Sequence, residues 1–244
     1  MAKRRKRRAA PARSRPGVPD VIANQVFLAV PWKAVRSKYE RCLDHFRSRS
    51  PLSFIIVGRS DAQDAKDLLE VIKDRLQSSS YAIFDASGGN ANVSLEYGYA
   101  EAVDIPRVLY VSTHGRSRKT SADPPIIADL AGKVRNHYKQ EAALKRLLGE
   151  FSKKHSYTVR LERFLVDIGK RRDKGTKKRN RALALKIIHS LDGAREVRRA
   201  DIVQQLLADQ SRYTAEEVDS IIAKLHNAKL IRSQRGRYAR VQIA

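Results

Sequence analysis

The chain has 244 residues and a formal net charge of +24 at pH 7, with 50 Lys and Arg residues against 26 Asp and Glu residues. A hydrophobic content of 42% suffices for one large or two small folded cores, which excludes a largely disordered protein. The excess of positive charge predicts attraction to a polyanion, and nucleic acid is the first candidate.

The cysteine count, the apolar segments and the histidine spacing bear on the compartment of the protein and on the kinds of binding site it can have. A single cysteine, Cys42, excludes an intramolecular disulfide and favours a reducing compartment. No segment approaches the roughly 20 consecutive apolar residues of a membrane span, and the N-terminus lacks the apolar core of a secretory signal. The histidines show no metal-ligand spacing, and there is no Walker loop. We therefore expect a cytoplasmic protein with no membrane partner, metal or cofactor.

Residues 1–20 combine a run of basic residues, 3–8, with several prolines. Such a segment buries too little apolar surface to offset its ordering entropy, so we predict a disordered basic tail. Its role stays open between a phosphate-binding arm, a nuclear address in a eukaryotic host, and a tail that only aids solubility.

Residues 21–155 alternate between short apolar strand patterns and amphipathic helical patterns. The strand patterns fall at residues 26–30, 54–57, 81–84, 108–111 and 134–138, and helical patterns at 33–47, up to 77, after 90, and at 140–151. This alternation predicts an α/β domain with a parallel sheet covered on both faces, in the flavodoxin-like strand order 2-1-3-4-5. In such sheets ligands bind beyond the carboxyl ends of the strands.

Candidate ligand-binding residues follow these strands. Trp32 comes after the first strand, and Gly58 and Arg59 come after the second. The polar loop after the fourth strand contains His114, which is either an acid for a leaving group or a solvated loop histidine.

The third strand leads into the most informative segment. Asp85 ends the strand, Gly88 and Gly89 permit a sharp turn, and a helix follows. Side chains on one stripe of this helix bring together a carboxamide, a carboxylate and a phenol: Asn92, Glu96 and Tyr99. If the stripe faces a pocket, Glu96 is a candidate catalytic residue; if it faces solvent, Glu96 is an ordinary surface residue.

A family resemblance rests on this segment. Five residues follow a pattern of a strand ending in Asp and then Asn-x-x-x-Glu-x-Gly-x-Ala: Asp85, Asn92, Glu96, Gly98 and Ala100. In this pattern the domain resembles the nucleoside 2-deoxyribosyltransferase-like and bacterial TIR-like families. The resemblance implies that Glu96 attacks, or stabilises positive charge at, the anomeric carbon of a ribosyl unit as its base or nicotinamide leaves. A carboxylate suits this reaction because the transition state is oxocarbenium-like.

The resemblance implies further roles. Asp85 is expected to hydrogen-bond a ribose hydroxyl, and the backbone of Gly88 and Gly89 to approach the sugar or a phosphate. Trp32 either stacks on the base or caps the core. Gly98 and Ala100 are expected to let their helix pack tightly on the sheet. Gly58, Arg59, Asn92 and Tyr99 complete the predicted substrate-binding set.

Residues 156–181 are predicted as a basic linker, with a helical pattern over 159–169 followed by the basic run 170–181. Residues 182–244 then show helical patterns at 182–191, 199–207 and 214–228, followed by a basic hairpin with strands at 230–233 and 238–243. This order resembles a winged helix-turn-helix. Thr214 and Glu217 predict a capping box for the third helix.

DNA contacts are expected from Lys224 on this third helix and from Arg235 and Arg237 at the hairpin tip. Acidic residues early in the same helix, among them Glu216 and Asp219, argue against strong major-groove reading. A winged helix that contacts protein instead of DNA stays open.

These features favour an enzyme, a nucleotide N-glycosyl hydrolase or transferase with NAD as the favoured substrate. A defence role, such as antiviral defence, or a stress role with nucleic acid as the trigger would connect the two domains. The alternative is a DNA-binding regulator whose α/β domain senses a nucleotide without catalysis, and a third reading is a protein-interaction module. The expected partners are a nucleotide and nucleic acid, and homo-oligomer formation is left open.

Overall fold

The computed structural model describes residues 20–33, 35–57, 68–113, 130, 133–169, 174–192, 196–208, 213–234, 236–240 and 242–243. Several sequence predictions lie outside these ranges: the tail before residue 20, Gly58, Arg59, His114 and Arg235. The remaining predicted site residues are all described.

Within the described residues, the main sheet has five parallel strands in the predicted order, β2-β1-β3-β4-β5. The strands are β1 (Val21–Ala29), β2 (Ser53–Ile55), β3 (Ser79–Asp85), β4 (Arg107–Ser112) and β5 (Arg135–Tyr138). The arrangement is consistent with a flavodoxin-like fold. The carboxyl ends of β1 to β4 therefore lie along one edge, where the sequence placed its candidate ligand-binding residues.

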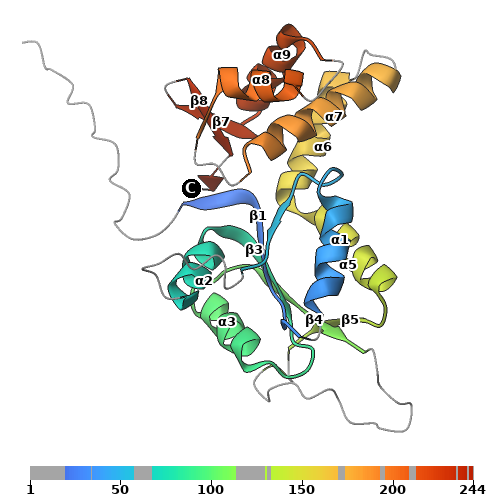
Figure 1. The fold of residues 1–244 in the computed structure, drawn as a ribbon, viewed down its shortest axis with the longest axis vertical. Helices are drawn as coiled ribbons and strands as arrows, with labels where there is room; N and C mark the ends of the chain where they lie inside the picture. The colour runs from blue at the N-terminus through green and yellow to red at the C-terminus, as the bar shows by residue number, and fades with distance from the viewer. Residues whose placement is uncertain are drawn as a thin grey trace, which may run out of the picture.

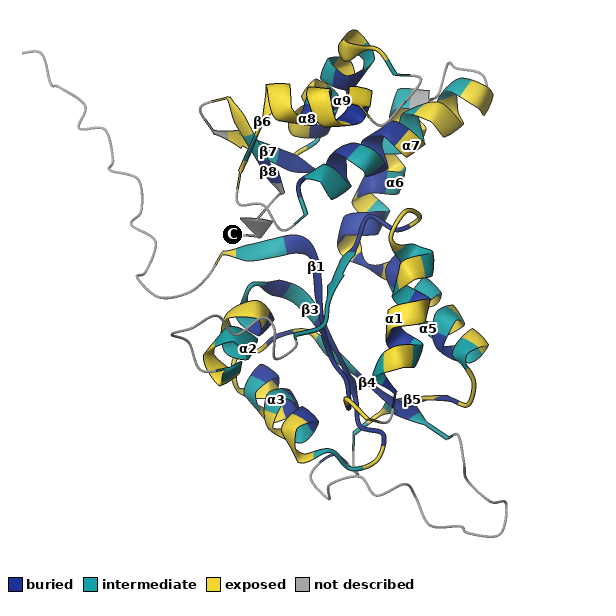
Figure 2. Ribbon diagram, viewed as in Figure 1, coloured by how far each residue is buried: buried dark blue, intermediate teal, exposed yellow. Residues whose placement is uncertain are grey.

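Helices cover both faces of this sheet (Figure 1). On one face lie α1 (Arg36–Phe46) and α5 (Glu141–Lys154), and on the other lie α2 (Leu68–Gln77) and α3 (Ala91–Ala102). Side chains of β1 alternate between the two layers, because Leu28 belongs to the core beneath α1 and α5 whereas Phe27 belongs to the core beneath α2 and α3. The central strands β1, β3 and β4 are buried on both sides over most of their length (Figure 2), which explains why their apolar runs lack alternation.

β1 begins earlier than its apolar pattern predicted, since two polar residues precede that pattern inside the protein. Asn24 and Gln25 are completely buried. The Asn24 amide donates to the carbonyl of Pro51 at 2.7 Å, and the Gln25 amide donates to the hydroxyls of Ser78 at 3.0 Å and Ser79 at 3.1 Å. These hydrogen bonds offset the cost of burying the amides, and the β1–β3 register shifts at the same place.

The C-terminal half consists of helices and a small antiparallel sheet. Its described helices are α6 (Ser156–Gly169), α7 (Lys174–Ser190), α8 (Arg199–Ala208) and α9 (Ala215–Asn227). The strands β6 (Val197–Arg198), β7 (Ile231–Gln234) and β8 (Arg237–Arg240) pair in the order β6-β8-β7. Thr214 and Glu217 form the predicted capping box at the start of α9.

The predicted linker over residues 156–181 is instead packed helix wherever it is described. Tyr157 and Leu161 of α6 are buried, and the Tyr157 hydroxyl donates to the carbonyl of Leu230 at 2.9 Å. Much of the basic run belongs to α7, because Lys and Arg favour helix and Arg181 pairs with Glu162 at 2.6 Å. The helical pattern predicted over residues 159–169 is confirmed by α6, but its packing in the interior was not predicted.

One short strand joins the two halves. β9 (Gln242–Ile243) pairs antiparallel with Val21 and Ile22 at the start of β1, so it belongs to the main sheet and not to the hairpin. The single hairpin strand predicted over residues 238–243 is thus divided between two sheets.

Candidate functional site

The turn between β3 and α3 has the conformation that its glycines predicted. Gly88 and Gly89 have φ angles of 74° and 63°, a region that residues with a side chain rarely adopt. The side chain of Asn90 then caps α3, accepting hydrogen bonds from the backbone N–H of Asn92 at 2.9 Å and Val93 at 3.3 Å. The helix begins at Ala91, and Asn92 lies in its first turn.

A cavity of about 80 Å³ lies beside this turn, at the carboxyl ends of β1 and β2. Its apolar lining comes from β1, the end of β2, α2 and α3: Phe27, Leu28, Ala29, Val30, Ile56, Val57, Leu68, Ile72 and Val93. The side chains that can bind a ligand through a ring or a polar atom are Trp32, Asn90, Asn92 and Glu96. The structure therefore brings three of the predicted residues, Trp32, Asn92 and Glu96, to one cavity.

Glu96 is half-buried in the wall of this cavity. Burial raises the pKa of its carboxyl group from the ordinary value of 4.5 to about 7. Within the described residues no cation is recorded as its ion-pair partner, so nothing there offsets the cost of removing the charge from water. A carboxyl group with a raised pKa in a cavity is a candidate functional group.

The predicted stripe faces the cavity only in its first half. Tyr99, one turn beyond Glu96, does not line the cavity. Its hydroxyl accepts a hydrogen bond from the amide of Gln77 at 2.6 Å, and the Lys73 ammonium lies 5.6 Å from the ring centroid. Tyr99 thus connects α3 to α2.

Asp85 lies in the interior, outside the cavity lining. One of its carboxylate oxygens accepts hydrogen bonds from the hydroxyls of Tyr39 at 2.8 Å and Tyr138 at 2.7 Å, and the other accepts from the backbone N–H of Ser87 at 2.9 Å. Burial raises its pKa, although these hydrogen bonds act in the opposite direction. The contacts place Asp85 in the support beneath the turn instead of at a ribose hydroxyl.

Two further predictions concerned the packing of Gly98 and the role of Trp32. Gly98 is exposed with open space around it, so only Ala100, which is fully buried, gives close packing of α3 on the sheet. Trp32 is 53% exposed, which fits a ligand-facing ring better than a cap over the core. The guanidinium carbon of Arg36 lies 3.8 Å from the centroid of the Trp32 ring. Arg36 was not among the predicted site residues.

The predicted DNA-contacting residues differ in exposure. Arg237 is exposed and lies 4.0 Å from Glu196, and Lys224 is half-buried. On α9, Glu217 pairs with Arg179 at 2.8 Å and Asp219 pairs with Arg199. These acids are therefore partly neutralised.

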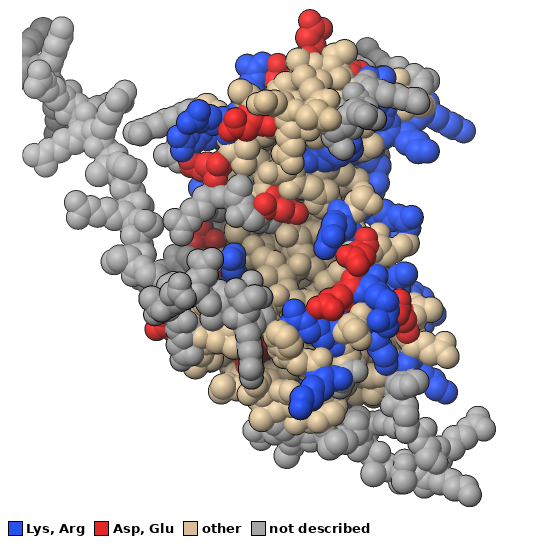
Figure 3. All heavy atoms as spheres, viewed as in Figure 1, with Lys and Arg blue, Asp and Glu red and all other residues tan. Residues whose placement is uncertain are grey.

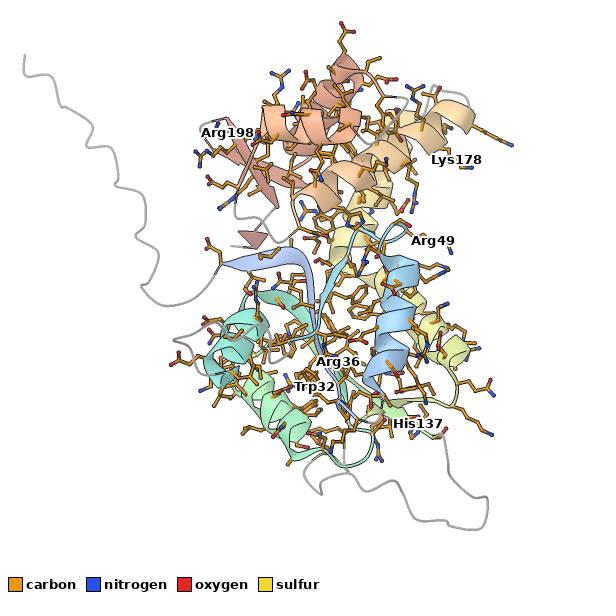
Figure 4. The ribbon with its side chains drawn as sticks, in the orientation of Figure 1. Trp32, Arg36, Arg49, His137, Lys178 and Arg198 are labelled. Carbon is orange, nitrogen blue, oxygen red and sulfur yellow. The ribbon has the colours of Figure 1, made fainter. Side chains whose placement is uncertain are left out.

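An unexpected cationic group lies on α7. Lys174, Lys177 and Lys178 are exposed and follow i, i+3, i+4 spacing, which puts them on one side of the helix. Figures 3 and 4 show basic side chains projecting from this end of the molecule, with Lys178 pointing away from it. Part of the charge of the predicted linker therefore lies on one side of helix α7.

Fold and cavity together define the class: an α/β protein whose parallel sheet presents a half-buried carboxyl group at the carboxyl ends of its strands. No protein-family model matches the chain, and no curated protein matches it. In the described parts of the chain, no helix is long and apolar enough to cross a membrane. The same residues contain no group of three or more His, Cys, Asp or Glu side chains arranged to hold a metal ion.

The raised pKa of Glu96 has a consequence for stability. Since the pKa of about 7 in the folded state exceeds the ordinary 4.5, ionising Glu96 opposes folding, and stability falls as pH rises between these values. Glu96→Gln cannot ionise, so we expect it to raise the free energy of unfolding at pH 8 by up to about 3 kcal/mol and to change little at pH 4.5. Urea denaturation at both pH values measures this difference.

Glu101 on the same helix is the control. Lys133 at 2.7 Å and Arg107 at 2.6 Å lower its pKa, so its charge stabilises the fold above its ordinary pKa. Glu101→Gln should therefore reduce stability at pH 8, opposite in sign to Glu96→Gln. A loss of stability in both variants at pH 8 would contradict the burial of an ionisable Glu96.

Proposed function

We propose that the chain is a nucleotide N-glycosidase, with NAD as the favoured substrate and Glu96 as the catalytic carboxylate. The observation that carries the proposal is the position of Glu96, half-buried in a cavity at the carboxyl ends of the strands. Ligands of flavodoxin-like sheets bind at this edge.

The chemistry fits a carboxylate at that position. When nicotinamide leaves a ribosyl unit, positive charge develops at the anomeric carbon, and a fixed carboxylate beside it lowers the transition-state energy. Partial burial of Glu96 removes some of the water that would otherwise screen this interaction. Glu96 then acts either as a nucleophile, forming a covalent ribosyl ester that water hydrolyses, or as a stabiliser of the cation.

The other lining residues would position the substrate. The cavity admits a group the size of roughly two or three water molecules, so one part of a nucleotide would enter it while the rest lies across the exposed ring of Trp32. The Asn92 carboxamide, one helical turn from Glu96, would hydrogen-bond a ribose hydroxyl in place of the role first expected of Asp85.

Incubation of the protein with NAD tests the reaction, with release of nicotinamide followed by liquid chromatography. Parallel incubations with deoxynucleosides distinguish a deoxyribosyltransferase-like activity, which releases a free base. Each should be run with and without duplex DNA, because a trigger role for nucleic acid predicts faster release in its presence. Absence of release under all these conditions would contradict the proposal.

We further propose that residues 174–240 form a winged helix that binds DNA. The order helix, strand, helix, helix and hairpin supports it, with β6 pairing to β8 as the base of the wing. Wing contacts would come from Arg235 and Arg237, and Lys224 would contribute from α9. The exposed lysines of α7 add positive field on the same half of the molecule.

The α7 lysines should set part of the salt dependence of DNA binding. Each phosphate contact adds about 0.9 to the slope of log affinity against log salt. Replacing Lys174, Lys177 and Lys178 together by alanine should therefore reduce the slope by about 2 to 3, as measured by fluorescence anisotropy with a labelled duplex.

Lys139, Lys153 and Lys154 are a matched control, since they are exposed but lie on and beside α5. Their joint replacement by alanine removes the same charge and should leave the slope nearly unchanged. An equal reduction in both variants would show that only net charge matters and would contradict a fixed contact at α7.

The second candidate function is a DNA-binding regulator that senses a nucleotide without turnover. The pKa of Glu96 near 7 favours it, because a substantial share of the carboxyl groups is protonated at neutral pH and can donate a hydrogen bond to a ligand. Binding of NAD without release of nicotinamide, together with altered DNA affinity, would support this function over the enzyme.

A further inference from the structure

Arg36, the first residue of α1, lies against the aromatic wall of the cavity. Its guanidinium carbon is 3.8 Å from the centroid of the Trp32 ring, and Trp32 lines the cavity with Glu96. Figure 4 shows the two side chains together at the edge of the sheet where β1 ends. Arg36 is therefore a neighbour of the proposed catalytic site that the sequence pattern did not identify.

The hydrogen bonds of this guanidinium are incomplete. Its Nε donates to the carboxylate of Glu40 at 2.7 Å, and Glu40 is half-exposed. Its Nη1 is buried and has no hydrogen-bond partner among the described residues. An unsatisfied buried donor is costly, and more so on a charged group, so an acceptor that reached Nη1 would recover that cost.

The geometry suits an anion. A guanidinium in contact with an aromatic ring is restricted in its movement, and its N–H groups match the oxygens of a phosphate. Glu40 uses only the Nε group, so the buried Nη1 group still has a hydrogen bond to offer to a ligand that reaches it. A displacement of the exposed Trp32 ring would uncover Nη1 for such a ligand.

We infer that Arg36 is the phosphate subsite of this cavity and that its ligand is a 5′-phosphorylated ribosyl compound instead of a free nucleoside. The inference rests on the proposed function, since it places a ribosyl unit at Glu96 and the attached phosphate at Arg36. It assigns to Arg36 the phosphate recognition that the proposed nucleotide substrate requires, and it excludes a free nucleoside as the ligand.

Trp32 is the only tryptophan of the chain, so its fluorescence reports directly on this site. Nicotinamide riboside and nicotinamide mononucleotide, which differ by the 5′-phosphate, should be titrated into the wild-type protein and into Glu96→Gln, which is designed not to turn over. We expect the mononucleotide to bind about tenfold or more tightly than the riboside in both.

Substitutions of single residues test whether Arg36 causes the preference for the mononucleotide over the riboside. Arg36→Gln should remove it, whereas Arg41→Gln, which deletes an exposed cation of the same helix paired with Glu141, should keep it. Glu40→Ala leaves Arg36 in place and removes the acceptor of its Nε, so it should tighten mononucleotide binding severalfold. This last variant tests the inference even if Arg36→Gln fails to fold.

Equal affinities for the two compounds, no binding of either, or a preference that survives in Arg36→Gln would overturn the inference. These outcomes are separable from failure of the proposed reaction. Selective binding of the mononucleotide without release of nicotinamide from NAD would contradict the reaction and leave the subsite standing. Release without a preference for the phosphorylated compound would contradict the subsite alone.

Discussion

Nicotinamide release from NAD should fall by about a thousandfold or more when Glu96 is replaced by glutamine. The substitution keeps the size of the side chain in the cavity but removes the negative charge that, in the proposed reaction, would face the anomeric carbon. Loss of a single well-placed electrostatic partner of a transition state costs about 10²- to 10³-fold, and loss of a nucleophile costs more. Single-turnover release, measured by chromatography, separates this loss from any change in binding.

The pH dependence gives the same prediction a second test. A nucleophile or charge stabiliser must be ionised, so the rate for the wild-type protein should rise as pH passes through about 7 and level off above it. Glu101→Gln, which removes a carboxylate from the exposed side of α3, should keep both the rate and the profile. Unchanged release in Glu96→Gln would remove Glu96 from the mechanism.

Asp85→Ala should destabilise the α/β domain by about 3 to 5 kcal/mol. The substitution leaves two buried tyrosine hydroxyls, those of Tyr39 and Tyr138, and the N–H of Ser87 without their acceptor. It also opens a cavity where β3 ends, since Asp85 is completely buried. Chemical denaturation followed by circular dichroism measures the loss.

Asp44→Ala provides the comparison, because Asp44 is exposed and its nearest cation, Arg47, is also exposed. We expect a change within about 0.5 kcal/mol for that variant. A loss below about 1 kcal/mol for Asp85→Ala would mean that water replaces the carboxylate without cost, which would contradict a supporting role for Asp85.

The strand order of the main sheet could be predicted because strong local patterns coincide with general topological rules. Apolar strands buried on both faces, alternating with amphipathic helices, leave few arrangements once crossovers are right-handed. The turn at Gly88 and Gly89 and the capping box at Thr214 were predictable for a similar reason. In each case the residues that determine the conformation lie within a few positions of one another.

The parts that could not be predicted depend on contacts between distant segments. Asn24 and Gln25 look like residues of a loop, yet they lie inside β1 because Pro51, Ser78 and Ser79 supply their partners. The helix over residues 159–169 could be predicted, but its packing in the interior is evident only from the contact of Tyr157 with Leu230.

The candidate site also combines residues whose positions could be predicted from local spacing with residues whose positions depend on distant contacts. The spacing of Asn92 and Glu96 predicted that they share a face, and the structure places both in one cavity. Asp85 was predicted from the family motif and Tyr99 from the helical stripe, but they contact Tyr39, Tyr138 and Gln77 instead. Arg36 could not be singled out, because its importance depends on stacking against a ring that precedes the helix.

The pairing of β9 with β1 bears on how the chain completes its folding during synthesis. Val21 is among the first described residues to leave the ribosome, and its partner Ile243 is among the last. β2 pairs with β1 only from Gln25 to Phe27, so among the described residues β9 is the partner of the β1 edge at Val21 and Ile22. Unpaired strand edges promote association between chains. Nascent chains that lack residues 242–243 should therefore be more prone than the complete chain to aggregate through β1.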